Sequence, residues 1–279
     1  MSRESNHPYS PTTPQHSMAN YNYADAFGYS ALAAAIVFTI AYVPLGGFFI
    51  LQSFKNPTYV HVVLAIFCAF RVTAFTIRAV LIGSDSAGEN LGLYIADQVL
   101  FGIGFFGLLY AAYTLVLDRE LLSDVPLGKG LISRLARNRR IFRFSLSAGV
   151  ALGIAGITTE ANDPTSSTGS ALRKASVIIF LVLTVLQAYQ TIVLVRREMD
   201  DDYHTVHAKA FGEKHGSFIL CAISVLLIVR EAFLTATISN TKAAANEHFW
   251  YPLVALPEIL AVILYCAPGL VPPRSELPK

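Results

Sequence analysis

Long apolar runs separated by short polar stretches dominate the chain from residue 30 onward. A helix that crosses the hydrocarbon of a bilayer needs about 20 mostly apolar residues, and a transmembrane β-barrel would instead show alternation with a period of two. No such alternation is present. The candidate spans are Ser30–Gln52, Thr58–Ile82, Gly92–Leu117, Phe142–Thr158, Leu172–Val195, Gly216–Ile238 and Phe249–Ala267. The pattern predicts an all-α polytopic membrane protein, a bundle of seven transmembrane helices.

The polar ends of the chain flank one membrane domain. Residues 1–29 are rich in Ser, Pro, Asn and Tyr and contain no apolar stretch of signal-peptide type. We expect them to form a disordered N-terminal tail, with the first helix as an uncleaved signal anchor. The predicted organisation is a tail at 1–29, a transmembrane domain at 30–267 and a C-terminal tail at 268–279.

The lysines and arginines between the spans are distributed unequally. Loops on the cytoplasmic side of membrane proteins carry an excess of these residues. One set of segments holds Lys55, Arg119, Lys129, Arg134, Arg137, Arg139, Arg140, Arg143, Arg196, Arg197, Lys209, Lys214, Arg274 and Lys279. The other set holds only Arg3, Arg173, Lys174 and Lys242. We therefore expect the N-terminus outside or lumenal and the C-terminus in the cytoplasm.

Composition agrees with a membrane location. Of 279 residues, 54% are hydrophobic and 14% charged, with a formal net charge of +2, whereas soluble domains carry roughly 25% charged residues. The near-neutral charge does not indicate nucleic acid binding. The expected partners are membrane lipid and a lipophilic small molecule. The protein is expected to be multi-pass, and the endoplasmic reticulum and the plasma membrane both remain open.

Six charged residues lie well inside the predicted spans, away from the span ends. They are Arg71, Arg78, Asp97, Arg230, Glu231 and Glu258. Each lies about four to eleven residues from the outer end of its run, which at about 1.5 Å per residue brings all six to similar depth. Such residues are expensive in lipid and face the bundle interior. Two compatible interpretations follow: an ion-pair network that holds helices together, and a polar cavity open toward the outer side. Arg78 and Asp97 are the natural pair by depth.

Glu258 directly follows Pro257, which removes a backbone N–H and frees the carbonyl of Leu253. A kink is expected there, and another at Pro44. Seven-residue spacing places Tyr251 and Tyr265 on the face of Glu258.

Spacings of three, four and seven residues place Tyr94, Phe101 and Gly104 on the face of Asp97. The two carboxylates are thus predicted to face a space lined by aromatic rings, although core packing explains such stripes equally well. Gln187, Gln190, Ser224 and Thr235 are expected to hydrogen-bond within the bundle.

Motifs of retinal proteins, seven-helix receptors and metal sites are absent or incomplete in this sequence. No lysine lies in the interior of a span, which excludes a retinal Schiff base. The stretch LDRE (Leu117–Glu120) is similar to the acidic–Arg signature of seven-helix receptors. Asp200, Asp201, Asp202, His204 and His207 could attract a divalent metal, but a second aspartate cluster is missing and a solvated loop is the better interpretation. No metal and no cofactor are expected.

Two stretches resemble the fungal lipid-translocating exporter family, small seven-helix proteins linked to aminocholesterol resistance and sphingoid-base release. They are FRVTAFTIRAVLI with the helix that follows it, up to LDRE (70–120), and EHFWYPLVALPEILAVILYCAPGLV (247–271). The family's His-Pro-Gly is Ala267-Pro268-Gly269 here. This resemblance implies a seven-helix fold and export of a lipid or amphiphile.

By size and architecture alone, the chain is also similar to the fungal membrane-bound terpene cyclases of meroterpenoid biosynthesis, a branch of secondary metabolism. That comparison implies an isomerase that cyclises a lipophilic isoprenoid by acid-initiated carbocation chemistry. Its catalytic residues would be Glu258 as the acid, with Asp97 or Glu231 as partner. Its substrate-binding residues would be Arg71, Arg78, Arg230, Tyr94, Phe101, Tyr251 and Tyr265.

A general acid needs a carboxyl group outside the arginine pairs, because a neighbouring guanidinium favours the ionised form. Glu258 is expected to qualify, since its own helix carries no arginine. Three functions therefore stay open: a membrane terpene cyclase, an exporter of lipids or amphiphiles, and a receptor or sensor that acts through the inner loop Asp118–Arg143.

Overall fold

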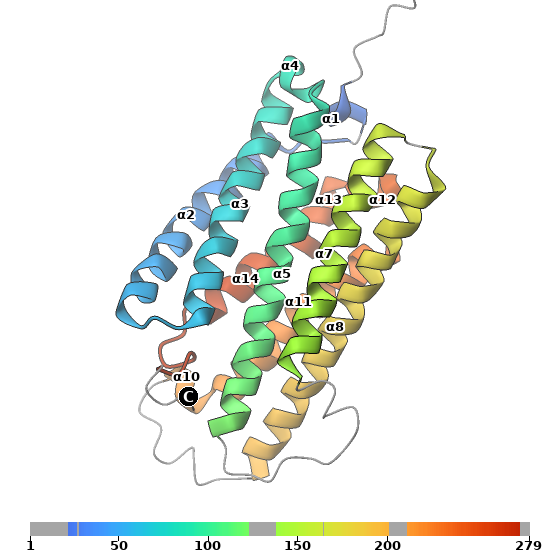
Figure 1. Ribbon diagram of the computed structural model, residues 1–279. Coiled ribbons are helices and arrows are strands. Elements are labelled where there is room, and N and C mark those ends of the chain that lie inside the picture. Colours follow the sequence, from blue (N-terminus) through green and yellow to red (C-terminus); the bar gives the residue numbers. More distant parts are fainter. Residues whose placement is uncertain (1–21, 27, 123–137, 164, 201–210, 274–279) are drawn as a thin grey trace, which may run out of the picture.

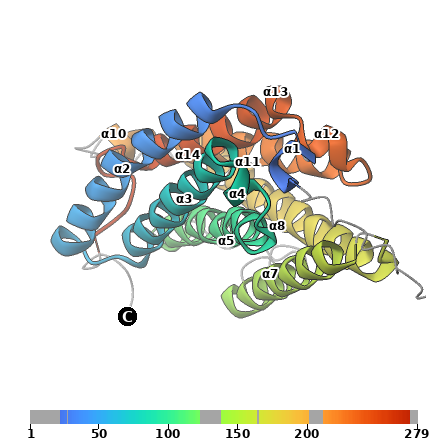
Figure 2. The ribbon, with the colours of Figure 1, turned by 90° about the horizontal axis from the view of Figure 1, so that it is seen from above.

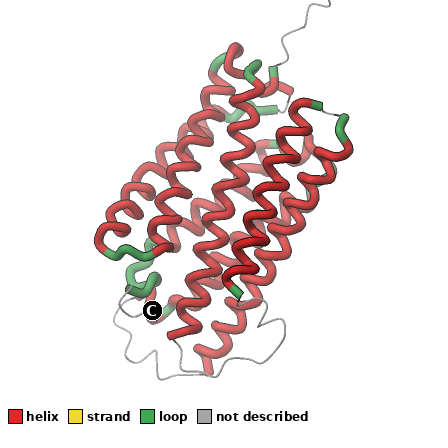
Figure 3. The backbone as a smooth tube through the Cα atoms, in the orientation of Figure 1, coloured by secondary structure: helices red, strands yellow, loops and turns green. Residues whose placement is uncertain are grey.

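The computed structural model describes residues 22–26, 28–122, 138–163, 165–200 and 211–273. Helices account for nearly all of this part of the chain, and no strand occurs in it (Figure 3). The helices are α1 (Tyr23–Ala26), α2 (Leu32–Lys55), α3 (Tyr59–Gly83), α4 (Asp85–Gly88), α5 (Leu91–Leu122), α7 (Arg139–Asn162), α8 (Ser167–Asp200), α10 (Phe211–Lys214), α11 (Gly216–Ala236), α12 (Thr241–Ala245), α13 (Glu247–Trp250), the π-helical segment η1 (Tyr251–Ala255) and α14 (Leu256–Tyr265).

Seven helical segments of the described chain are long and apolar enough to cross a membrane. They are α2, α3, α5, α7, α8, α11 and the continuous segment Glu247–Tyr265, which joins α13, η1 and α14. The predicted all-α bundle of seven transmembrane helices is confirmed, and the protein is multi-pass.

Several spans extend beyond their apolar runs, α5 and α8 the furthest. The helix α5 continues past Leu117 to Leu122, and α8 begins before Leu172 and continues past Val195 to Asp200. The predicted spans end at Leu117 and Val195, directly before charged residues. Backbone hydrogen bonds within a helix do not depend on the polarity of its side chains, so both helices continue into the polar region.

The helix α5 occupies the middle of the bundle (Figures 1 and 2). It packs against α3, α7, α8 and α11, and its apolar stretch is the most buried of the seven. The helix α2 is the least buried span and packs mainly along α3. Any residue placed on α5 is therefore close to several neighbours, which makes this helix one wall of any internal site.

Large apolar side chains cover much of the outer surface. Val37, Ile40 and Phe54 of α2 are 62%, 65% and 82% exposed. In water, contiguous exposure of this kind marks a binding surface or an aggregation hazard. Around seven spans it is the surface that contacts lipid.

The two ends of the bundle carry different short helices. The end that carries α10 holds ion pairs between neighbouring helices, Arg139 with Asp118 and Arg197 with Glu120. The opposite end carries α1, α4, α12 and α13 (Figure 1); we call it the N-terminal end. The predicted placement of the N-terminal end outside remains a prediction. Most of the inner loop Asp118–Arg143 and of the Asp200–His207 cluster lies outside the described residues.

Candidate functional site

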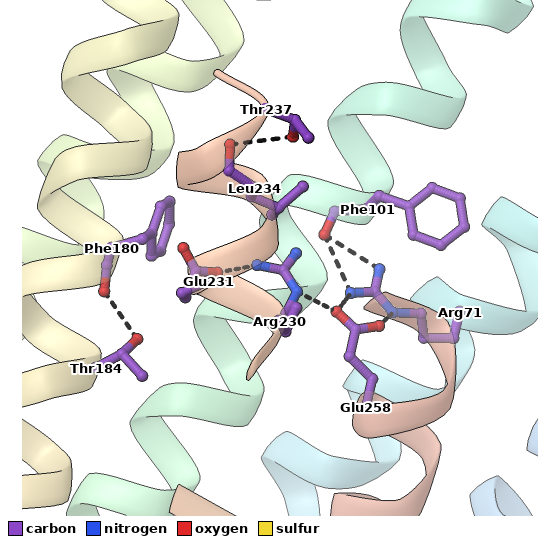
Figure 4. A network of polar contacts seen from close by, with 9 residues as sticks. All are labelled: Arg71, Phe101, Phe180, Thr184, Arg230, Glu231, Leu234, Thr237 and Glu258. Carbon is purple, nitrogen blue, oxygen red and sulfur yellow. Dashed lines mark hydrogen bonds and ion pairs between the residues drawn. The ribbon is translucent and has the colours of Figure 1, made fainter. Parts of the chain in front are cut away.

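The six predicted charges form two groups of contacts, which lie between the middle of the bundle and its N-terminal end. All six residues are buried. The first group joins Arg71 of α3, Glu258 of α14, and Arg230 and Glu231 of α11 (Figure 4). The second joins Arg78 of α3 and Asp97 of α5.

Glu258 lies at the centre of the first group. Its Oε2 accepts from Arg71 Nε and its Oε1 from Arg71 Nη2, both at 2.7 Å, and Oε1 also accepts from Arg230 Nε at 2.7 Å. Three charge-assisted bonds favour the ionised carboxylate. The expectation that Glu258 lies outside the arginine pairs is therefore wrong, because arginines of two other helices reach it.

Arg230 also donates to Oε1 of Glu231, the residue that follows it. Consecutive residues on a helix point in different directions, so this contact depends on the length of the arginine side chain. The result is a continuous chain Arg71–Glu258–Arg230–Glu231 across three helices (Figure 4).

A glycine makes room for Arg71. A Cβ at Gly104 would lie 2.8 Å from Arg71 Nη1. The guanidinium also donates to the carbonyl of Phe101, at 3.2 Å from Nη1 and 3.1 Å from Nη2. Gly104, which was predicted to share the face of Asp97, therefore allows α5 to lie close to the Arg71–Glu258 pair.

The predicted pair of Arg78 and Asp97 is confirmed. Arg78 Nη2 lies 2.8 Å from Oδ2 and Nε 3.3 Å from Oδ1. Tyr29 donates to Oδ2 at 3.3 Å, and its hydroxyl accepts from Gln98 Nε2 at 2.6 Å. Burial raises the pKa of Tyr29 well above its ordinary value, and the positive charge of Arg78 opposes this shift without cancelling it, so this phenol stays a hydrogen-bond donor.

Aromatic rings surround the arginines. The guanidinium of Arg78 lies 4.0 Å from the ring centroid of Trp250 and 4.4 Å from that of Phe101, and the guanidinium of Arg230 lies 3.7 Å from that of Phe105. Desolvated cation–π contacts contribute about 2 kcal/mol or more each. Phe101, which the sequence predicted to bind substrate, thus already faces the guanidinium groups of Arg71 and Arg78.

A cavity of about 210 Å³ lies beside these groups. Its walls come from α5, α7, α8, α11 and the segment from α12 to η1, and every lining residue belongs to the half of the bundle next to the N-terminal end. Phe105, Phe180 and Glu231 mark its deep end. The volume is below the roughly 300–1,000 Å³ of drug-sized sites, so it suits a small ligand or one end of a longer one.

The predicted site residues divide with respect to this cavity. Lining residues include Arg78, Arg230, Glu231, Tyr94 and Phe101. Asp97, Glu258, Arg71, Tyr251 and Tyr265 are not among them. Asp97, Glu258 and Arg71 have no exposed surface, because their polar atoms point into the ion pairs. The prediction that Asp97 and Glu258 face an aromatic space is therefore wrong, and of the three predicted carboxylates only Glu231 lines the cavity.

Glu247 was missed as a site residue. Its Oε2 accepts from the backbone N–H groups of Ser30 and Ala31, at 2.7 and 2.5 Å, and so caps the start of α2, which has no side-chain cap of its own. Glu247 is buried and lines the cavity, and within the described chain its Oε1 has no hydrogen-bond partner. The one signal in the sequence was an acid placed directly before three aromatic residues.

The last span changes its geometry just before Glu258. Residues Tyr251–Ala255 form a π-helical turn, and the N–H of Leu256 bonds to the carbonyl of Tyr251. Pro257 follows in the first turn of α14. Single π turns inside α-helices are frequent at functional sites. Here the irregular turn lies between the cavity, lined by Trp250 and Val254, and the carboxylate of Glu258.

A second polar cluster lies deeper, between α8 and α11. Gln187 Nε2 donates to Ser224 Oγ and to Thr191 Oγ1, each at 3.0 Å. This confirms the predicted hydrogen bonding for Gln187 and Ser224. Gln190 and Thr235 have no side-chain partner in the described chain, so for them the prediction is not met.

Fold and site together define a seven-span membrane protein with a buried network of arginines and carboxylates beside a small internal cavity. The chain belongs to the family described as "Domain of unknown function (DUF7702)", whose model matches residues 30–271. Comparison with curated proteins and with solved structures found no match.

Proposed function

We propose that this protein binds a lipophilic small molecule in the cavity and carries it across the membrane, as an exporter of amphiphiles. The observation that carries the proposal is the placement of the cavity, wholly in one half of the bundle and ending at the Arg230–Glu231 contact. A carrier that alternates between two sides presents its site to one side at a time.

The last span supports the same proposal. In transporters, irregular helix segments line the binding site near the middle of the membrane. The π turn at Tyr251–Ala255 and the proline at 257 form such a segment, next to the cavity. The ion pairs of Glu258 connect α14 to α3 and α11, so a rearrangement of the last span changes contacts with two other helices.

An acid-initiated terpene cyclase is the second candidate. Glu258 and Asp97 each form a bidentate pair with an arginine, which favours their ionised forms and opposes a role as proton donor. Glu231 also accepts from Arg230, but only through its Oε1, and of the three predicted acids it alone lines the cavity, in company with Phe105 and Phe180. If the protein is an enzyme, we infer that Glu231 is the proton donor.

Metabolite profiles of cells distinguish these functions. Deletion cells are complemented with wild type, with Gly102→Phe, which fills the cavity, or with Gly47→Phe, which adds the same ring on the exposed face of α2. A Cβ at either glycine meets no atom within 4 Å. A carrier changes how existing species divide between cells and medium. We expect wild type and Gly47→Phe to restore that distribution and Gly102→Phe not to.

A new chemical species that depends on wild-type protein would overturn the carrier proposal. Loss of that species in Glu231→Gln, with normal protein level, would then support the cyclase.

A further inference from the structure

The charges around the cavity do not balance. Three buried arginines face four buried carboxylates, and Arg173, which also lines the cavity, is paired with Glu160. The arginines are Arg71, Arg78 and Arg230, and the carboxylates are Asp97, Glu231, Glu247 and Glu258.

The excess carboxylate is Glu247. Arg78 pairs with Asp97, while Arg71 and Arg230 pair with Glu258 and Glu231. Glu247 is 7% exposed, and among the described residues no arginine or lysine contacts it. The start of α2 satisfies its Oε2, and the positive end of that helix stabilises a negative charge there.

The unpartnered oxygen of Glu247 indicates that the cavity binds a positively charged group. A buried carboxylate oxygen without a donor costs free energy that a bound donor recovers. A metal ion is poorly supported, because the described residues contain no group of three His, Cys, Asp or Glu side chains that could hold one. The unpaired negative charge of Glu247 would repel an anionic head group. The arginines that line the cavity would not compensate, because carboxylates already neutralise them. An organic ammonium supplies both the charge and the N–H donors.

We propose that the cavity binds an amphiphile with a primary ammonium head group, held by Glu247, and with its apolar chain directed toward Phe105 and Phe180. This inference rests on the proposed binding function and specifies the ligand class. Apolar lining residues of α5, α7 and α8, among them Val99, Val150, Ile154 and Val177, form the path for the chain.

The protein carries its own reporter for this test. Trp250 is the single tryptophan of the chain and lines the cavity. Its fluorescence in lipid nanodiscs is recorded while octylamine, octanol or octanoate is added. These three probes share one chain and differ in the charge of the head group. We expect octylamine to act at a concentration at least about tenfold below that of octanol, since a hydrogen bond to a charged group contributes about 1.5–3 kcal/mol.

Two substitutions locate the effect. Glu247→Gln keeps an acceptor for the start of α2 but removes the charge, so the preference for octylamine should disappear while the response to octanol stays. Asp85→Asn removes an exposed carboxylate at the same end of the bundle and should leave the preference intact. If Glu247→Gln fails to fold, Gly102→Phe supplies the test, because filling the cavity should abolish the response to octylamine.

The outcomes separate the two proposals. Equal responses to all three probes that Gly102→Phe removes would overturn the ammonium site and leave the binding cavity standing. A preference for octylamine that survives Glu247→Gln and is lost in Asp85→Asn would show attraction at the surface and would also overturn it. No response to any probe would overturn the binding function itself.

Discussion

Arg71 and Glu258 are 187 positions apart and form a two-pronged ion pair with no exposed surface on either side chain. The pair joins the second span to the last and holds the carboxylate in place for Arg230. Buried pairs of this kind contribute little net stability over an apolar replacement, but the loss of one partner leaves an uncompensated charge and costs about 3–5 kcal/mol.

This asymmetry predicts the behaviour of single and double variants. Glu258→Leu should lower the midpoint of thermal unfolding strongly, because Arg71 loses its carboxylate. The double variant Arg71→Met with Glu258→Leu should recover part of the loss. Unfolding in detergent, followed by Trp250 fluorescence, measures both. Ile263→Ala, at a half-exposed position of the same helix, is the control. A double variant as unstable as the sum of the single variants would contradict the pair.

The close approach of Arg71 to Gly104 predicts that alanine substitutions at Gly104 and at Gly102 of α5 change stability in opposite directions. Gly104→Ala places a methyl group 2.8 Å from Arg71 Nη1, and the guanidinium is held by several bonds and has little room to yield. The unfolding midpoint should fall. At Gly102 a Cβ meets nothing within 4 Å, so Gly102→Ala should raise stability by up to about 1 kcal/mol through helix propensity. Equal effects at the two glycines would rule out the close approach.

The cap that Glu247 gives to α2 predicts a graded series. Glu247→Ala removes the acceptor for the N–H groups of Ser30 and Ala31 and should cost about 0.5–2 kcal/mol, as for other lost caps. Glu247→Gln keeps an oxygen acceptor and should cost less. Ser30→Ala removes only the weaker hydroxyl contact at 3.2 Å and should have the smallest effect. Thermal unfolding of the three variants gives the order, and the reverse order would refute the cap.

The charge asymmetry of the loops predicts which side each end of the bundle faces. Ser86→Cys and Lys55→Cys place thiols at exposed positions on opposite ends, in a background without Cys68, Cys221 and Cys266. A membrane-impermeant maleimide should label Lys55→Cys once digitonin opens the plasma membrane. Ser86→Cys should react in intact cells if the protein is in the plasma membrane, and only after full solubilisation if it is in the endoplasmic reticulum. Labelling of Lys55→Cys in intact cells would show that the orientation is the opposite of the predicted one.

Hydropathy predicted the fold because insertion into lipid is decided locally, span by span. A run of about 20 apolar residues crosses the bilayer whatever its neighbours are, and the segments around Pro44 and Glu258 remained helical in spite of their unusual residues. The ends of α5 and α8 were placed too early, since charged residues end an apolar run without ending a helix.

Depth along the span predicted one ion pair and failed for the others. Arg78 and Asp97 lie on sequential spans at similar depth, and they pair. Glu258 lies on a helix without arginine, yet it receives Arg71 and Arg230 from two other helices. Rotation of each helix about its axis and the reach of a long side chain decide such contacts, and neither can be read from spacing within one helix.

The sequence by itself determined that this chain spans the membrane seven times and that three arginines and three carboxylates lie within the spans, because both properties depend on local composition. The tertiary structure alone decided which carboxylates are neutralised, where the cavity lies, and that Glu247 keeps one oxygen without a donor in the described chain. Those properties arise where helices distant in sequence pack together, so only the arrangement of the whole bundle defines them.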